Sequence, residues 1–285
     1  MTNRKRIAVL GATGMLGHVM AEYLHNLNEF DVEAIARHEH HFPVAVFDIT
    51  DFQKLERWLS EFEPQVVVNC IGILVQNANE NIANAVLVNS YLPHKVAEIG
   101  KRLGFQLIHI STDCVFSGSA GSYREDAVPD GDGPYARTKA LGEVINDSDL
   151  TIRTSIVGPE LKKNGTGLLD WFLKQRQAVT GFDRVFWSGV TTLELAKAVA
   201  LSIRSELTGL VHLCPPQKIS KYELLSLFKE IWSRDIQILR NVTTNSDKSL
   251  VNTKLSTFPN SADYHIMLNE LKVWMDNHCE YYSHY

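Results

Sequence analysis

The feature that most constrains the fold is a set of three glycines, Gly11, Gly14 and Gly17, each three residues from the next. Because 17 of the 285 residues are glycine, chance predicts only about 0.06 such triples. An apolar run at 5–10 precedes them, and a helical pattern follows to about Leu27. Strand, glycine turn and helix in this order predict a site for the pyrophosphate of a dinucleotide. The alternative is a glycine-rich turn that binds no ligand.

Apolar segments alternate with helical patterns up to Val157. We expect strands at 5–10, 30–36, 44–47, 65–70, 105–110 and 150–156. Thr50 begins a stretch with capping-box spacing and is expected to cap a helix. A second helix, 81–103, is expected to kink at its proline and to end at Gly104. This alternation predicts an α/β fold with a Rossmann-type doubly wound parallel sheet.

The pattern changes after Gly158. We expect a helix at 168–177, an irregular stretch at 182–190, and a strand at 209–214; the polar stretch 241–262 has no assignment. Capping boxes at Thr191 and Ser220 each open a helix, and the first of these is expected to return to the sheet. We therefore predict a dinucleotide-binding domain of residues 1–157 plus about 188–214. A smaller C-terminal substrate domain comprises about 158–187 plus 215–285.

The catalytic hypothesis centres on Tyr135 and Lys139, four residues apart on one predicted helix face. A nearby ammonium lowers the pKa of a tyrosine and prepares it for proton transfer near neutral pH. The same spacing recurs at Tyr91 and Lys95. Only the first pair follows a hydroxyl residue at the end of a strand, Thr112. We therefore expect Thr112, Tyr135 and Lys139 to converge.

Two residues after the second and third strands bear on the choice of dinucleotide. Arg37 can pair with a 2′-phosphate and favours NADP, whereas an acid there would favour NAD. Its alternative is a solvated surface arginine. Asp48 could contact the adenine edge, or could simply belong to the helix start beside Thr50. His38, Glu39, His40 and His41 resemble metal ligands by composition, but no second ligand cluster matches them, so we expect a surface loop and no metal.

Several other side chains are candidates for the substrate side. Cys114 is expected to line the pocket, because no adjacent histidine would activate it as a nucleophile. Trp171, Phe172 and Trp187 could stack on a base, with Lys162, Lys163 and Arg184 near a diphosphate. The alternative is a small-domain core with surface lysines.

Composition excludes some classes of partner. The net charge is −5 with no basic block, which argues against nucleic acid. The first apolar run, 7–10, is too short for a signal peptide or a membrane span. The four cysteines form no CxxC pair, which indicates free thiols in the cytoplasm.

With these motifs in chain order, the sequence resembles extended short-chain dehydrogenases/reductases, and most closely the dTDP-4-dehydrorhamnose reductase group of sugar-nucleotide reductases. The resemblance is carried by Gly11-Ala-Thr-Gly-Met-Leu-Gly17, Ser111-Thr-Asp-Cys-Val-Phe-Ser-Gly118, Tyr135-Ala-Arg-Thr-Lys-Ala-Leu-Gly-Glu143 and Arg153-Thr-Ser155. It implies that Thr112 and Tyr135 contact the reacting carbonyl and that Lys139 holds the nicotinamide ribose.

The predicted contacts divide into two sets. Those to the cofactor are Gly11, Thr13, Gly14, Met15, Leu16, Arg37, Asp48, Ile49, Cys70, Ile71, Gly72, Tyr135 and Lys139. Those to the substrate are Asp113, Cys114, Phe116 and Trp187. Cys114 departs from the reductase group, which usually has tyrosine at this position. Sugar-nucleotide dehydratases have Thr-Asp-Glu in this loop, with the glutamate at the position of Cys114. The cysteine therefore argues against a dehydratase.

The sequence therefore predicts an NAD(P)H-dependent reductase of a nucleotide-activated 4-keto-6-deoxy sugar, in deoxysugar or surface polysaccharide biosynthesis, including lipopolysaccharide. NADP(H) is preferred and NAD(H) is allowed. A nucleotide sugar is the expected partner, with no nucleic acid or membrane, and a homodimer is compatible with the resemblance. Two alternatives remain open. One is an epimerase or dehydratase of the same fold; the other is a non-catalytic NADP-binding subunit, like the β subunit of methionine adenosyltransferase.

Overall fold

The computed structural model describes residues 4–39, 42–254 and 258–285. Its centre is a sheet of seven strands in the order β10-β6-β5-β4-β1-β2-β3, all paired in parallel. The strands are β1 (Lys5–Leu10), β2 (Phe30–Ala36), β3 (Ala45–Val46), β4 (Val66–Asn69), β5 (Gln106–Thr112), β6 (Leu150–Thr154) and β10 (Gly209–His212). The strand order reverses beside β1, where the crevice for a dinucleotide forms in such sheets. The predicted Rossmann-type parallel sheet is confirmed.

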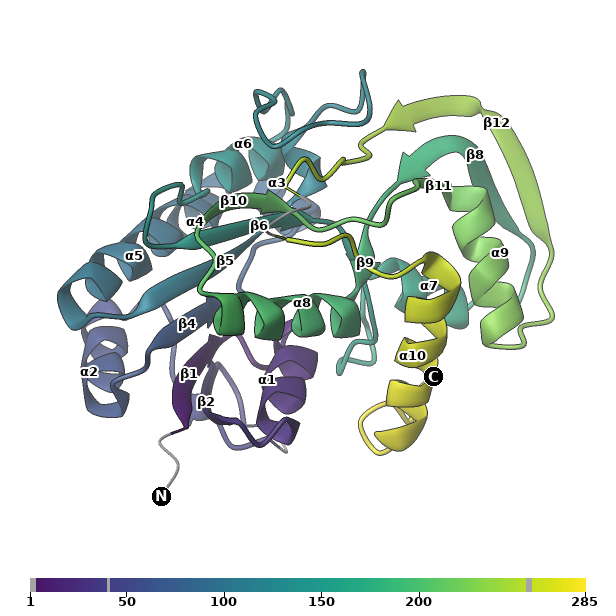
Figure 1. The fold of residues 1–285 in the computed structure, drawn as a ribbon. Coiled ribbons are helices and arrows are strands. Elements are labelled where there is room, and N and C mark those ends of the chain that lie inside the picture. The colour runs from purple at the N-terminus through teal and green to yellow at the C-terminus, as the bar shows by residue number, and fades with distance from the viewer. Residues whose placement is uncertain (1–3, 40–41, 255–257) are drawn as a thin grey trace.

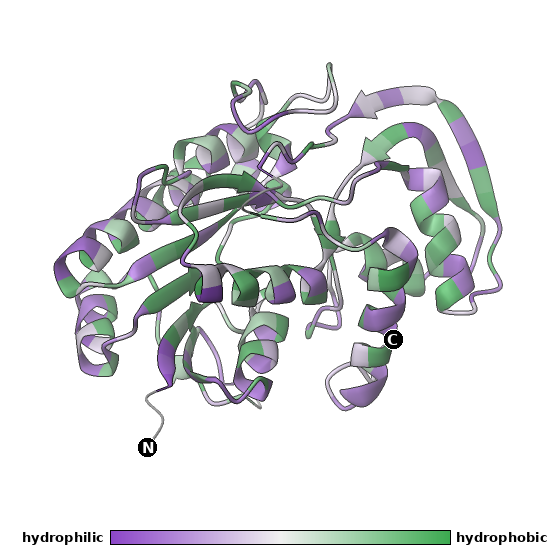
Figure 2. Ribbon diagram, viewed as in Figure 1, coloured by the Kyte–Doolittle hydropathy of each residue, from purple (hydrophilic) through white to green (hydrophobic). Residues whose placement is uncertain are grey.

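Helices cover both faces of this sheet (Figure 1). Helices α1 (Gly17–Asn26) and α8 (Thr192–Ser205) pack on one face, so the helix from Thr191 does return to the sheet. Helices α2 (Phe52–Phe62) and α5 (Leu92–Leu103) pack on the other. Along β1, Ile7 and Val9 belong to the first core and Ala8 and Leu10 to the second, because successive strand residues face opposite sides. Figure 2 shows the strands as largely hydrophobic and the helices as mixed, as this two-sided burial requires.

The helical region after β4 contains a π-helical turn. Helices α3 (Val75–Glu80) and α4 (Ile82–Ala85) lead into π-helical residues Val86–Tyr91, and α5 follows directly. Pro93 lies in the first turn of α5, and Gly104 ends that helix with a φ of 83°. The wider turn places the interruption just before the proline, where a missing N–H does least harm.

A smaller sheet, β11-β8-β12, packs against α9 (Lys221–Ile231). Its strands are β8 (Val179–Trp187), β11 (Ile219–Ser220) and β12 (Ile238–Asp247). The expectation of an irregular stretch at 182–190 was wrong, because this region forms most of β8 and then the short strand β9 (Val190–Thr191). The unassigned stretch contributes most of β12, which pairs in parallel with β8.

Two helices differ locally from the sequence predictions. Asp51, not Thr50, caps α2, because its carboxylate accepts the Lys54 N–H. Helix α7 (Leu168–Leu173) is shorter than expected. The remaining elements are the 3₁₀ turn Asp113–Val115, α6 (Pro134–Leu141), β7 (Ile156–Val157) and α10 (Tyr264–Asn277). No helix of the described residues is long and apolar enough to cross a membrane.

Candidate active site

The glycine turn has the close packing that a dinucleotide site needs. Gly11 has a φ of 89°, a conformation that glycine adopts without strain. A Cβ on Gly17 would overlap the carbonyl oxygen of Gly11, so only glycine lets α1 start this close to the turn. No acidic side chain lies in the first turn of α1, and no side chain caps it. The N–H groups at the start of α1 are therefore available to bind an anion, and the glycine turn fits a pyrophosphate there.

The segment after β4 lies against the same turn. The Cys70 N–H donates to the Leu10 carbonyl at 3.1 Å. A Cβ on Gly11 would lie 2.7 Å from Cγ1 of Ile71. The predicted cofactor contacts after β1 and after β4 are therefore neighbours at the carboxyl edge of the sheet.

Thr112 ends β5, and Tyr135 lies in the first turn of α6. Thr112 is 8% exposed. The Thr112 hydroxyl lies close enough to the Tyr135 phenol to favour its phenolate form and so to lower its pKa. The structure thus brings together the hydroxyl and the phenol that the sequence places 23 residues apart.

Burial dominates the protonation of Tyr135. It raises the pKa of the phenol above its usual value, and the charges of Cys114 and Asp113 act in the same direction. The expectation that Lys139 lowers this pKa was wrong, because the Lys139 ammonium is directed elsewhere. It donates to the Ile110 carbonyl at 2.8 Å. A phenol with a raised pKa stays protonated at neutral pH and is a proton donor.

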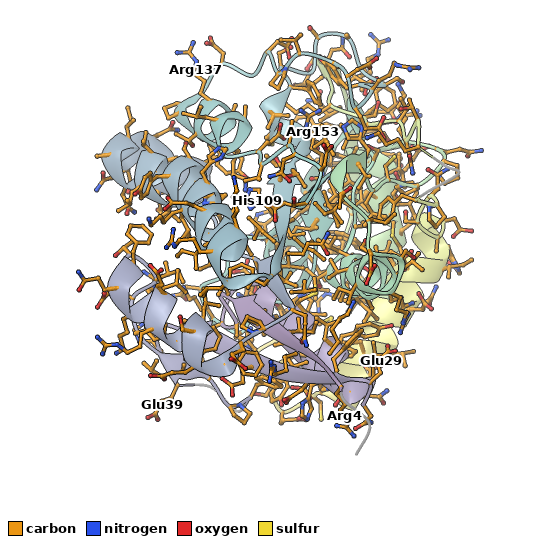
Figure 3. The ribbon with its side chains drawn as sticks, turned by 60° about the vertical axis from the view of Figure 1, so that its left-hand side comes forward. Arg4, Glu29, Glu39, His109, Arg137 and Arg153 are labelled. Atoms are coloured by element: carbon orange, nitrogen blue, oxygen red, sulfur yellow. The ribbon has the colours of Figure 1, made fainter. Side chains whose placement is uncertain are left out.

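Lys139 belongs to a buried polar chain that runs under the site. Its Nζ lies 3.4 Å from Nε2 of His109, and Nδ1 of His109 lies 3.2 Å from Nδ2 of Asn69. Oδ1 of Asn69 accepts the Ile71 N–H at 3.1 Å, which orients the amide. Burial lowers the pKa of Lys139 to about 8 and that of His109 well below its usual value. Figure 3 shows His109 in the interior of the molecule, far from the peripheral Arg137.

A buried ion pair supports the catalytic segments from behind. Nε and Nη2 of Arg153 each lie 2.7 Å from an oxygen of Glu143, and both side chains are 3% exposed. Ser111, next to Thr112, donates to Glu143 at 2.7 Å. Arg153 also donates to the Glu125 carbonyl at 3.2 Å. The Arg153–Glu143 pair thus links β6 and the end of α6 to β5, through Ser111, and to the long loop between β5 and α6, through Glu125.

Asp113 and Cys114 face the N-terminus of α9. The charge of Lys221 opposes the rise in the pKa of Asp113 that burial causes. Burial lowers the pKa of Lys221 to about 8, and the Asp113 and Cys114 charges oppose this change. Burial also raises the pKa of Cys114 to about 11, so its thiol is not a nucleophile at neutral pH. The sequence reasoning did not single out Lys221.

Two of the predicted substrate contacts need correction. Phe116 is 0% exposed, stacks on Tyr123 with ring centroids 4.1 Å apart, and lies under Arg153. Trp187 is 3% exposed and is covered by Lys221, whose Nζ lies 4.8 Å from the ring centroid. Both rings therefore pack in the protein interior, which leaves no free face for a substrate.

The cofactor's predicted adenosine end lies at the ends of β2 and β3. Arg37 and Asp48 are both exposed, and the charge of Arg37 adds to the lowering of the Asp48 pKa. The main cause of that lowering is hydrogen bonding from Thr50, so Asp48 does take part in the helix start. Ile49 is buried in the core below. No cluster of metal ligands is found among the described residues, and His40 and His41 lie outside them.

Comparison with known proteins now identifies the family. Residues 5–277 match the model of the RmlD substrate binding domain. This chain belongs to that family. dTDP-4-keto-6-deoxy-D-glucose reductase of Streptomyces niveus is 28% identical to this RmlD-family chain over 247 residues, 84% of the chain and 83% of that protein.

Two further matches have names that describe different functions. Methionine adenosyltransferase 2 subunit beta of Xenopus laevis is 21% identical over 262 residues, 84% of this chain and 75% of that protein. The crystal structure of Bacillus anthracis dTDP-4-dehydrorhamnose reductase in complex with NADP shares the fold, with a TM-score of 0.83 and 21% identity over 95% of this chain and 98% of that one. Relatives of this RmlD-family chain thus carry different functions, and the site residues must decide between them.

Sequence reasoning missed three polar residues that the site uses. Asn69 and His109 are 0% exposed, and each interrupts an otherwise apolar strand pattern. A polar residue within a fully buried strand was the signal that could have found them. Lys221 had no such signal, because it opens a helix and only the fold brings it to Asp113.

Proposed function

We propose that this protein is an NADPH-dependent reductase of a nucleotide-activated 4-keto-6-deoxy sugar. The observation that carries the proposal is the close approach of the Thr112 hydroxyl and the Tyr135 phenol at the carboxyl end of β5, the strand whose Ile110 carbonyl binds buried Lys139. The glycine turn lies at the same edge of the sheet. Relatives named as dTDP-sugar reductases support the substrate class.

The chain's own residues supply positioning and a proton. Gly11 to Leu16 and Cys70 to Gly72 would hold the dinucleotide, with Arg37 at its 2′-phosphate. Bound NADPH supplies the hydride that reduces the ketone carbon. As the carbon–oxygen double bond opens, Tyr135 gives its proton to the oxygen, which becomes the product hydroxyl. Thr112 donates a hydrogen bond to the same oxygen.

The raised pKa of Tyr135 suits this direction of reaction. A protonated phenol is the acid that a forming alkoxide requires, and burial keeps it protonated at neutral pH. Lys139, whose ammonium donates to the Ile110 carbonyl, would hold the nicotinamide ribose. Asp113 and Cys114 would face the sugar.

The decisive assay incubates the purified protein with 4-keto-6-deoxy sugar nucleotides carrying dTDP, UDP, GDP or CDP. NADPH or NADH is added, and the loss of nicotinamide absorbance is compared with product. The expected result is one NADPH consumed per sugar reduced, with NADH used less well. Sugar conversion without net NADPH consumption would instead indicate an epimerase or dehydratase.

A regulatory subunit is the second candidate, favoured by the match to methionine adenosyltransferase 2 subunit beta. Such a protein would bind NADPH and reduce no sugar nucleotide in the same assay.

The homodimer stays a prediction, which light scattering on the purified protein would test. The cytoplasmic location stays a prediction for cell fractionation, and the two-domain division one for limited proteolysis.

A further inference from the structure

The C-terminal segment returns to the glycine turn through a tyrosine–histidine contact. His18 lies in the first turn of α1 and is 3% exposed, and Tyr282 is 5% exposed. Nε2 of His18 lies 2.8 Å from Oη of Tyr282, although the residues are 264 positions apart. Nδ1 of His18 lies 2.8 Å from the carbonyl oxygen of Gly14. The middle glycine of the turn is thus linked to the end of the chain by one imidazole ring.

The hydrogen-bond chemistry fixes the direction of this link. A carbonyl oxygen only accepts, so Nδ1 of His18 carries the hydrogen that Gly14 receives. In a neutral ring Nε2 then accepts, and the Tyr282 hydroxyl is its donor. Trp274 of α10 donates its indole N–H to Oη of Tyr282 at 3.4 Å. The donors therefore point one way, from Trp274 through Tyr282 and His18 to Gly14.

Holding the Gly14 carbonyl also orients the next amide. In a planar trans peptide the carbonyl of Gly14 and the N–H of Met15 point in opposite directions. The Gly14 carbonyl points into the protein toward His18. The backbone N–H of His18 donates a second hydrogen bond to this carbonyl, at 3.3 Å. The Met15 N–H consequently points to the open side of the turn, where Gly14 is exposed. That is the side from which a pyrophosphate approaches.

A second tyrosine of the same segment holds the facing loop. The Glu160 N–H donates to Oη of Tyr285 at 2.7 Å. The Glu160 carboxylate in turn accepts the N–H groups of Thr166 and Gly167, at 2.8 and 2.5 Å. A Cβ on Gly167 would lie 3.2 Å from Sδ of Met15, so this loop borders the glycine turn.

We propose that the segment His278–Tyr285 is a positioning element of the dinucleotide site. Tyr282, acting through His18, fixes the Gly14–Met15 peptide for the pyrophosphate, and Tyr285, acting through Glu160, holds the loop beside it. The proposal rests on the proposed function for the identity of the dinucleotide. It gives the last residues of the chain a part in cofactor affinity, although they do not belong to the sheet.

The test compares Tyr282→Phe with a matched control, Tyr264→Phe. Each change removes one buried hydroxyl, and the Tyr264 hydroxyl donates to the Trp187 carbonyl at the end of β8, at 3.1 Å, rather than to His18. NADPH affinity is measured directly by the fluorescence of the bound nicotinamide, without sugar. Losing one preorganising hydrogen bond should raise the Kd of Tyr282→Phe about 5-fold to 10-fold. The KM for NADPH should rise in parallel while kcat and the KM for sugar stay near wild type.

The control should lose similar stability in urea and keep wild-type NADPH affinity. Wild-type affinity in Tyr282→Phe, or an equal loss in Tyr264→Phe, overturns the proposal. A wild-type protein that binds no NADPH would overturn the proposed function itself, so the two failures are distinct.

A measurement on the unaltered protein makes the test independent of folding in the variants. Long-range ¹⁵N–¹H spectra of histidine rings should show His18 as the Nδ1–H tautomer across neutral pH. The Nε2–H tautomer would break the link to Gly14 and overturn the proposal, even if Tyr282→Phe proves insoluble.

Discussion

Lys139 donates a 2.8 Å hydrogen bond to the carbonyl oxygen of Ile110, two residues before Thr112. This contact holds α6 against the end of β5 and keeps the ammonium away from the phenol of Tyr135. The Asn69 amide donates to Nδ1 of His109, so Nε2 of His109 carries the hydrogen that faces Lys139 at 3.4 Å. An N–H group that faces Lys139 favours the neutral form of its amine. It therefore lowers the pKa of Lys139, as burial does.

The first prediction concerns the cost of burying this amine. Folding lowers the pKa of Lys139 from 10.5 to about 8, so the unfolded chain binds more protons between these values. The folded state therefore gains stability as the pH rises from about 8 to 10.5. Lys139→Met should be more stable than wild type at pH 7, by up to roughly 3 kcal/mol. This advantage should shrink toward pH 10.5 in urea unfolding, and an advantage that does not change with pH would contradict the lowered pKa.

The second prediction separates binding from chemistry at Tyr135. Tyr135→Phe keeps the ring and removes the proton, so NADPH should bind normally while kcat falls at least about 10²-fold. Tyr91→Phe is the control, because Tyr91 has the same spacing to a lysine but is 49% exposed. Stopped-flow measurement of NADPH oxidation reports both variants. Near-normal turnover in Tyr135→Phe would reject its role as the acid.

The third prediction addresses the buried pair of Arg153 and Glu143. Removing one partner strands the other charge, so Arg153→Met and Glu143→Gln should each cost about 3 to 5 kcal/mol of unfolding free energy. The double variant should lose clearly less than the sum, because it leaves neither charge unpaired. Urea unfolding of the four proteins gives the coupling. Additive losses would show that the pair does not act as a unit.

The sequence predicted the parts of the fold that depend on local patterning. The glycine turn and β1 follow from steric rules that act within a few residues, and the structure has both where expected. The convergence of Thr112 and Tyr135 also follows, because side chains at a strand end and on the next helix share one edge of a parallel sheet. The Ser220 capping box was visible for the same reason, since both of its hydrogen bonds are local.

What the sequence did not show depends on contacts between distant segments. Strand β12 has an exposed polar face and pairs with β8, which lies about 60 residues earlier in the chain. Neither segment can therefore be recognised as a strand from its own sequence. Phe116 and Trp187 looked like substrate contacts because aromatic rings serve equally well in a core. The pKa of Tyr135 was misjudged because burial raises it and because the Ile110 carbonyl, not the phenol, binds the Lys139 ammonium. Only tertiary structure reveals such a competitor.

The last prediction tests the choice of dinucleotide at Arg37. This side chain is exposed after β2 and has no role in the core, so its loss should leave stability unchanged. A guanidinium that binds a 2′-phosphate contributes a charge-assisted hydrogen bond, which NADH cannot use. Arg37→Ser should therefore raise the Kd for NADPH about 10-fold and leave that for NADH unchanged. Arg57→Ser removes another exposed cation and controls for the change in net charge. The NADPH effect of Arg37→Ser should diminish at high salt, because exposed charges are screened. Equal weakening of both dinucleotides, or the same loss in Arg57→Ser, would mean that Arg37 does not read the phosphate.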